Sequence, residues 1–364
     1  MKKRYESLDA FRGICAICVV LFHLHVAGSI TDLGFFKGSD IFVEFFFCLS
    51  GFVLAHGYAY KDGLKFIPYM YSRFVRLYPL HIFMLIVFIV LEICKLVASK
   101  YTGIEFNTAP FSGANSVSEI IPNALLIHSW SWLTNSLSFN YPSWSISIEF
   151  YMYAILFATI FSFKKYKVYS WVSIALIGLA LSINNTLIPT PEVIRGVMCF
   201  FSGAAIYSLH RKIPELNISR ILATTIEIIL LSLAVFFVSL DYEDRYLFCI
   251  PTFLIVIMFF SYESGFISNS LKKPAFQYVG KLSYSIYMTH AAVIFFLMTI
   301  MVVIQKFTGI EFAPMVDGAR KLTSGNVYVN NIIVLAVVTI VILISNITYK
   351  NIEIRFLKYK NKFN

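Results

Sequence analysis

The chain has 364 residues, of which 58% are hydrophobic and only 14% are charged. A typical soluble domain carries about 25% charged residues, and a chain as apolar as this one has too few polar side chains to cover a folded surface. The same composition excludes a disordered chain and a small secreted domain stapled by disulfides. The sequence therefore predicts a polytopic membrane protein.

The net charge of +10 arises from 30 Lys and Arg against 20 Asp and Glu. In a soluble protein such an excess would favour nucleic-acid binding. Here the positive residues lie in short loops between apolar stretches, which is typical of membrane topology, and we expect no nucleic-acid partner. The 6 cysteines lie in or beside apolar stretches, where they are expected to pack as thiols, and no metal site is expected.

Ten apolar stretches approach the length of about 20 residues that crosses a bilayer. They are 10–30, 40–59, 78–99, 144–163, 168–184, 193–209, 218–239, 246–261, 284–305 and 328–348. Lys and Arg gather in alternate loops and at both ends of the chain, so the positive-inside rule places both termini in the cytoplasm. We expect an all-α fold of about ten transmembrane helices, in one integral-membrane domain over 1–364, with the long 100–143 loop facing outward.

Ionisable residues within the spans cost about 2.5–3.5 kcal/mol each on insertion, so each is a candidate for a site or for a structural ion pair. Arg12 and His23 are close to three helical turns apart and share a helix face, with His23 in the outer half. Glu44 and Glu149 are predicted at a similar depth, and a histidine beside carboxylates can act as a general base. Spacing does not show that the three helices are neighbours. Separate structural pairs, such as Glu149 with Arg195, are the alternative.

Other charged residues near the spans are less specific. Arg73 and Arg76 lie at the cytoplasmic end of the third span, with a spacing that suits phosphate, although ordinary anchoring at the membrane surface explains them as well. Glu92 and Lys95 are expected to neutralise each other, and Glu227 is a weaker site candidate. The sequence contains no GxSxG elbow, P-loop, HExxH or Rossmann glycine pattern, which argues against hydrolase, ATPase and dehydrogenase functions.

Five segments together resemble the bacterial membrane-bound acyltransferase-3 family, the O-acetyltransferases of cell-surface polysaccharides. They are SLDAFRGICAICVVLFHLH, VEFFFCLSGFVL, YSRFVRLYPLH, PSWSISIEFYMY and GKLSYSIYMTH, in the family's order over 7–290. The chain departs from the family pattern in three places. Glu44 stands where Asp is usual, Met152 replaces a Phe, and the segment 349–356 lacks the family's proline.

The resemblance implies transfer of an acyl group, usually acetyl, from cytoplasmic acyl-coenzyme A to a hydroxyl of a surface or exported carbohydrate, free or lipid-linked. It implies a multi-pass protein of the bacterial cytoplasmic membrane, in contact with membrane lipid. Some relatives carry an SGNH-type domain, and we expect none appended here. The oligomeric state does not follow from it. The motifs assign catalysis to His23, Glu44 and Glu149, coenzyme binding to Arg12, Arg73, Arg76 and His290, and acceptor binding to Asp9, Ser50, Trp144 and Ser147.

Two other functions are compatible with the sequence. A small-molecule O-acyltransferase, for instance one that modifies a macrolide, would use the same site with a different acceptor. A transporter or flippase without chemistry of its own could use buried histidines and carboxylates as a proton relay. The sequence shows no internal repeat of the kind that transporters often carry.

Overall fold

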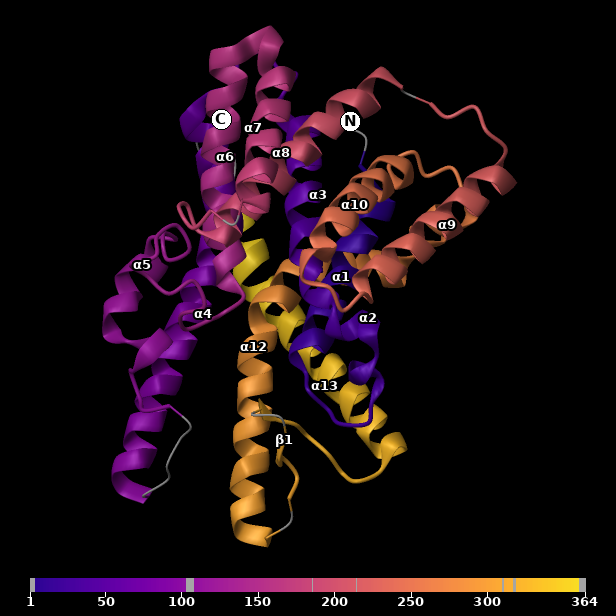
Figure 1. Cartoon of the computed structure of the whole chain (residues 1–364). Helices are drawn as coiled ribbons and strands as arrows, with labels where there is room; N and C mark the ends of the chain where they lie inside the picture. The colour runs from indigo at the N-terminus through magenta and orange to yellow at the C-terminus, as the bar shows by residue number, and fades with distance from the viewer. Residues whose placement is uncertain are drawn as a thin grey trace. The chain divides into compact units, whose positions relative to one another are not determined.

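The computed structural model describes residues 4–102, 108–184, 186–213, 215–309, 311–316 and 319–359, and these are almost entirely helical (Figure 1). The described residues include one very short antiparallel ribbon, in which β1 (Met315–Val316) pairs with β2 (Ala319–Arg320). Four lysines that contributed to the predicted orientation, Lys2, Lys3, Lys360 and Lys362, lie outside the described residues.

The chain divides into two compact units, and each is built from two separate stretches of sequence. The first unit comprises Met1–Phe52 and Ile206–Ile347, and the second comprises Val53–Ala205 and Thr348–Asn364. Two long helices, α3 (Phe42–Tyr58) and α8 (Pro191–Lys212), run from one unit into the other.

The first unit contains most of the helices near the N-terminus and in the last third of the chain. They are α1 (Glu6–His23), η1 (Ile30–Asp32), α2 (Gly34–Lys37), η2 (Ser39–Ile41), α9 (Arg220–Val238), η6 (Glu243–Arg245), α10 (Tyr246–Phe260), α11 (Phe266–Ser270), α12 (Pro274–Thr308) and α13 (Val327–Thr348). Helix α1 packs against both α12 and α10, and α9 packs against α10 and α11 (Figure 1).

The second unit is built around three helices of the central region. Its elements are α4 (Phe66–Thr102), η3 (Gly113–Asn115), η4 (Val117–Glu119), α5 (Ile120–Ala124), α6 (Ser143–Phe163), η5 (Lys164–Tyr166), α7 (Lys167–Ile183), the π-helical turn η7 (Tyr349–Glu353) and α14 (Ile354–Leu357). Helix α4 packs against α6 and against the C-terminal turn η7 with α14, and α6 also packs against α7.

Among the described residues, seven helical segments are long and apolar enough to cross a membrane. They are Ser39–Tyr58, Phe66–Tyr101, Ser143–Ile183, Pro191–Lys212, Arg220–Val238, Pro274–Gln305 and Val327–Leu357. An all-helical polytopic membrane protein is therefore confirmed. Every predicted span coincides with a helix. Seven segments are found in the described part of the chain, instead of ten, for three reasons: α6 and α7 form one segment, α1 is too polar in its first turns, and α10 has only 15 residues. The number of ten spans stays a prediction.

Several helix boundaries differ from those expected. Helix α1 ends at His23 rather than at residue 30, because Leu24 is extended and the chain then forms a parallel bridge between Val26 and Leu322. Helix α12 begins at Pro274, ten residues before the predicted span, with proline in the first turn where its missing N–H costs nothing. Hydropathy marks the apolar part of a helix, and the polar turns beyond it escape detection.

Two glycines allow α1 and α12 to pack in close contact. A Cβ atom on Gly13 would lie 2.6 Å from the backbone nitrogen of Gly280, and a Cβ on Gly280 would collide with the carbonyl oxygen of Asp9. Only glycine fits at such a backbone approach, as at other helix crossings built on small residues. The contact fixes the relative position of these two helices within the first unit.

The buried acid Glu227 has a structural role. Its side chain lies on α9 and is 1% exposed, and its carboxylate accepts hydrogen bonds from the backbone N–H groups of Gly265, Ile267 and Ser268 at 3.0–3.4 Å. These are the N–H groups at the start of α11, which have no partner within that helix. Glu227 therefore fastens the loop after α10 to α9.

Glu92 and Lys95 form the predicted ion pair. The Lys95 Nζ atom lies 3.0 Å from Glu92 Oε1, and both side chains are almost fully buried. The Glu92 carboxylate also accepts hydrogen bonds from the Phe111 N–H at 2.9 Å and the Asn115 side-chain amide at 2.8 Å. The pair thus anchors part of the 108–115 segment to α4.

Candidate active site

His23 and His290 are brought together in the first unit. Their imidazole rings are 5.3 Å apart between centroids and are stacked with an interplanar angle of 23°. Gly13 and Gly280 precede these histidines by ten residues each, so α1 and α12 run in parallel and the pair lies about 15 Å along both helices from the glycine contact. Both helices therefore contribute one histidine to the same place.

The surroundings of this histidine pair are aromatic. His290 is fully buried, and its Nδ1 atom lies 3.3 Å from the carbonyl oxygen of Ile286. The Tyr287 ring lies 6.0 Å from the His290 ring, and the Phe22 ring lies 4.7 Å from the His23 ring. An imidazole can act as a general acid or a general base, so the pair is a candidate for proton transfer.

The structure also shows where His290 lies along its helix. The apolar stretch that begins at 284 predicts this residue about seven residues into the ninth span. Helix α12 begins at Pro274 instead, and the additional turns place His290 level with His23. Its role as a coenzyme ligand stays a prediction.

A charged cluster occupies the other end of α1. The Asp9 carboxylate accepts hydrogen bonds from Arg4 Nε at 2.6 Å and from Arg12 Nη1 at 3.2 Å. Arg4 also donates to the side-chain oxygen of Gln277 on α12 at 3.3 Å. Asp9 lies about 21 Å along α1 from His23, so the structure groups Asp9 with the arginines. Arg4 was missed in the sequence because it precedes the family motif.

The remaining predicted residues of the first unit lie on α3. Glu44 is in the first turn of this helix and its side chain is 4% exposed, and Ser50 is half-buried further along. A carboxylate so deeply buried requires compensation by a partner or a ligand. The convergence of Glu44 on His23 stays a prediction, as does that of Glu149, which belongs to the second unit.

In the second unit, Arg73 lies in a box of tyrosines. Its side chain is 8% exposed, and its Nη2 atom donates a hydrogen bond to the Tyr58 hydroxyl at 2.9 Å. The guanidinium carbon lies 5.3 Å from the centre of the Tyr58 ring and 6.0 Å from that of Tyr153, within the range of cation–π attraction. Arg76, expected to act with it, is exposed. The two arginines therefore have different surroundings.

Two further contacts complete this arginine–tyrosine box. The Tyr153 hydroxyl donates a hydrogen bond of 2.6 Å to Glu149, which links the predicted acid to the ring beside Arg73. Tyr69 packs its ring 4.8 Å from that of Tyr58, and its buried hydroxyl has no hydrogen-bond partner among the described residues. Sequence reasoning missed these three tyrosines, because aromatic residues in a membrane helix are by default packing residues.

Trp144 and Ser147 lie at the start of α6, where this helix forms hydrogen bonds with residues 126–130 of the preceding loop. The Ser147 hydroxyl donates to the carbonyl of Leu126 at 2.6 Å, and the Trp130 indole N–H donates to the Ser147 carbonyl at 3.2 Å. The Ser129 hydroxyl donates to the Trp144 carbonyl at 3.0 Å. These bonds give both residues a structural role, and their part in acceptor binding stays a prediction.

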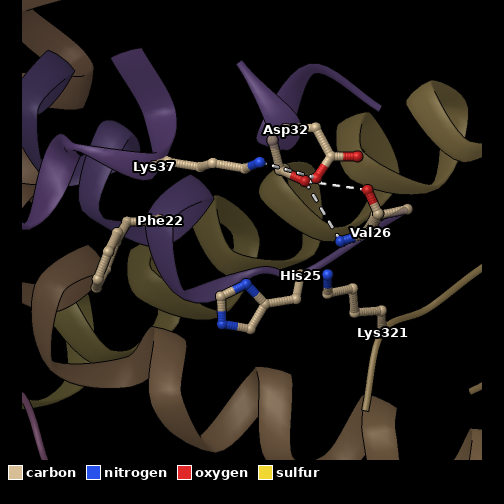
Figure 2. A pocket seen from close by; sticks show the side chains of 7 residues that line it. Phe22, His25, Val26, Asp32, Lys37 and Lys321 are labelled. Carbon is tan, nitrogen blue, oxygen red and sulfur yellow. Dashed lines mark hydrogen bonds and ion pairs between the residues drawn. The ribbon is translucent and has the colours of Figure 1, made fainter. Parts of the chain in front are cut away.

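A pocket of about 250 Å³ opens where the chain leaves α1 (Figure 2). It is lined by Phe22, His25, Val26, Thr31, Asp32, Lys37 and Lys321. Figure 2 shows the Lys37 side chain extending toward Asp32, with the His25 ring and Lys321 beside it. His25 follows the end of α1, and burial, followed by the charge of Lys321, lowers the pKa of its imidazole. Among the described residues, no group of three or more His, Cys, Asp or Glu side chains could hold a metal ion.

These features define the class of the protein: a multi-pass membrane protein with a histidine pair and a buried arginine box inside its helices. The sequence profile described as "Acyltransferase domain" matches residues 5–350, so the chain belongs to the acyltransferase-3 family. No solved structure matches the chain.

Three named proteins are similar to it. Acyltransferase MdmB of Streptomyces mycarofaciens is 32% identical over 41% of this chain and 38% of its own length. Protein 2 in the picA locus of Rhizobium radiobacter is 34% identical over 28% of this chain and 53% of its own length. Peptidoglycan O-acetyltransferase OatA of Listeria monocytogenes is 25% identical over 80% of this chain and 50% of its own length. The chain thus spans about half or less of each relative that it matches.

Proposed function

We propose that the protein transfers an acyl group, in the simplest case acetyl, from cytoplasmic acyl-coenzyme A to a hydroxyl of a cell-surface or exported carbohydrate. The observation that carries the proposal is the stacked pair of His23 and His290 between two family motifs. The similarity to a peptidoglycan O-acetyltransferase over 80% of the chain supports a carbohydrate acceptor.

In the proposed reaction His23 is the general base. It removes the proton of the acceptor hydroxyl as that oxygen attacks the thioester carbonyl carbon. The carbon–sulfur bond then breaks, and the coenzyme leaves as a thiol after taking up the proton from the imidazolium. His290 positions the His23 ring through the stack, and Glu44 and Glu149 keep the catalytic role that the family motifs imply. A hydroxyl is a weak nucleophile at neutral pH, so such a base contributes about 10²–10⁴-fold.

The coenzyme is proposed to bind through arginines. Arg73 is a buried cation with neutral hydroxyl and aromatic contacts. Arg12 and Arg76 are each predicted at the cytoplasmic end of a span. Guanidinium groups bind phosphate in a bidentate manner, and coenzyme A carries several phosphate oxygens. The proposal includes ten spans, cytoplasmic termini and insertion in the bacterial cytoplasmic membrane.

The test is turnover of labelled acetyl-coenzyme A by the purified protein in membranes that contain the surface glycan. We expect His23→Gln to lower labelled product by at least about 10²-fold. His210→Gln is the matched control, since His210 is also buried but its two ring nitrogens lie 3.3 and 3.1 Å from the Tyr5 and Ser261 hydroxyls. A transporter would give no thioester turnover in the unsubstituted protein, and this result would contradict the proposal.

A further inference from the structure

We infer that the pocket at the end of α1 holds an anionic group of the acceptor, a carboxylate or a phosphate, beside the hydroxyl that is acylated. The inference deepens the proposed function and rests on it. It narrows the acceptor from carbohydrates in general to carbohydrates that carry negative charge next to the acylation site.

The pocket is lined by residues that lie on both sides of the proposed base in the sequence. Phe22 lines it, and the Phe22 ring packs 4.7 Å from the ring of His23, which is not itself a lining residue. His25 and Val26 line the pocket two and three residues after His23. An acceptor with one group in this pocket would therefore present its neighbouring atoms to the end of α1 that carries His23.

The charge of the pocket lining favours an anion. Lys37 and Lys321 contribute two positive charges, whereas Asp32 contributes the one negative charge of the seven lining residues. Both oxygens of that carboxylate have partners, since Oδ2 accepts from the Gly28 N–H at 2.6 Å and Oδ1 lies 3.8 Å from Lys37 Nζ. Burial, followed by the positive charge of Lys321, lowers the pKa of the His25 imidazole. A ring N–H of His25 can donate a hydrogen bond to the same ligand.

The backbone holds this charge arrangement in place. The His25 carbonyl accepts a hydrogen bond from the Leu322 N–H at 2.9 Å, and the Leu322 carbonyl accepts one from the Ala27 N–H at 2.9 Å. These bonds fix Lys321 beside His25 although the two are far apart in sequence. A preformed site costs less ordering on binding than a mobile one.

The size of the pocket limits what enters it. Pockets that enclose a drug-sized molecule measure about 300–1,000 Å³, and this one measures about 250 Å³. It therefore suits a single charged substituent or one sugar ring of a longer acceptor. Lysine ammonium groups act as point charges, so they accept a carboxylate or a phosphate without demanding one geometry.

The first experiment identifies the acceptor. Surface glycans of a strain that lacks the gene are compared by mass spectrometry with those of strains carrying the unsubstituted protein, Lys321→Gln, Lys321→Arg or Lys100→Gln. We expect the glycan that loses its acyl group to carry a carboxylate or phosphate on the acylated sugar or the adjoining one. Lys321→Gln should lower acylation, Lys321→Arg should restore it, and Lys100→Gln, an exposed lysine outside the pocket, should leave it unchanged.

The second experiment separates charge from folding. Purified protein is supplied with labelled acetyl-coenzyme A and fragments of that glycan, either native, methyl-esterified at carboxylates or treated with phosphatase. Lys321→Gln should raise KM for the native fragment about tenfold and leave kcat unchanged. The unsubstituted protein should show a similarly high KM for whichever of the two modified fragments has lost the recognised charge. Slow hydrolysis of acetyl-coenzyme A without acceptor should be equal in both proteins, which shows that the variant is folded.

The possible results have different meanings. A neutral acylated glycan, or equal KM values for native and neutralised fragments, would overturn the anion assignment and leave the proposed function standing. Absence of any gene-dependent acylation together with absence of acetyl-coenzyme A turnover would overturn both. If the methyl ester loses affinity, the group is a carboxylate, and if the phosphatase-treated fragment does, it is a phosphate.

Discussion

A charged side chain inside an apolar bundle needs a partner or a ligand, and the two cases can be separated residue by residue. Glu227 has three backbone N–H groups, and Lys95 has Glu92. Arg73 differs, because its polar contacts are the hydroxyls of Tyr58 and Ser72 and, among the described residues, no carboxylate pairs with it. A buried cation whose contacts are neutral favours the binding of an anion.

Tyr69 offers a sharp test of that arginine–tyrosine box. Its buried hydroxyl has no hydrogen-bond partner among the described residues, and such a group costs about 1–3 kcal/mol. We therefore expect Tyr69→Phe to stabilise the ligand-free protein by about 1 kcal/mol. If the hydroxyl binds the coenzyme, the same change should raise KM for acetyl-coenzyme A about tenfold. Thermal unfolding of the ligand-free protein measures the first effect, and initial rates at varied acetyl-coenzyme A concentrations measure the second.

The matched control is Tyr151→Phe, which removes a hydroxyl that donates to the Leu125 carbonyl at 3.0 Å. We expect this variant to be less stable and to keep its KM. Tyr69→Phe with an unchanged KM would show that the orphan hydroxyl does not take part in coenzyme binding.

At the scale of elements, the histidine pair depends on the packing of α1 against α12. The two helices run in parallel, and the close contact at Gly13 and Gly280 sets their register. Ten residues on, the same register stacks His23 on His290. The two helices are in close contact near their N-terminal ends, and the two histidines lie ten residues further on. Any separation of α1 from α12 at the glycines would therefore also separate the histidine rings.

Gly280→Ala tests this dependence. A methyl group there would collide with the Asp9 carbonyl oxygen, which is backbone and cannot move aside, so α1 and α12 must separate. We expect the free energy of unfolding to fall by about 1–3 kcal/mol, as for other overpacked sites, and acyl transfer to fall at least tenfold. Gly57→Ala is the control, since a Cβ there meets nothing within 4 Å and alanine favours the helix. Equal activity of the two variants would contradict the proposed register.

The sequence could predict much of this level of structure but not all of it. Apolar stretches located every long helix, and the spacing of Glu92 and Lys95 predicted their ion pair. The early start of α12 was missed because its first turns are polar. The pairing of His290 with His23 was missed for the same reason. The pocket at His25 was missed because it depends on the bridge between Val26 and Leu322, a contact that no local pattern encodes.

At the scale of the molecule, the distribution of charge bears on how the chain is inserted. Two compact units each draw on two stretches of the chain, and α3 and α8 continue from one unit into the other. The proposed reaction needs the coenzyme arginines on the cytoplasmic side and the lysine pocket on the opposite side. The positive-inside rule predicts these two positions from the number of Lys and Arg residues in each loop.

Cysteine labelling in intact cells tests this arrangement. Cys94 is the exposed native cysteine, so it is replaced by serine, which leaves five buried thiols as a silent background. Single cysteines are then introduced at Lys37 and Lys100, predicted to lie outside, and at Lys165 and Lys212, predicted to lie in the cytoplasm; all four side chains are exposed. A membrane-impermeant maleimide should label the first two in intact cells and the last two only after permeabilisation. Successive loops must alternate between the two sides of the membrane, so labelling of Lys165→Cys in intact cells would require a different number of spans before this residue. Labelling of Lys37→Cys only after permeabilisation would place the pocket on the same side as the coenzyme. That result would remove the basis for the proposed anionic ligand.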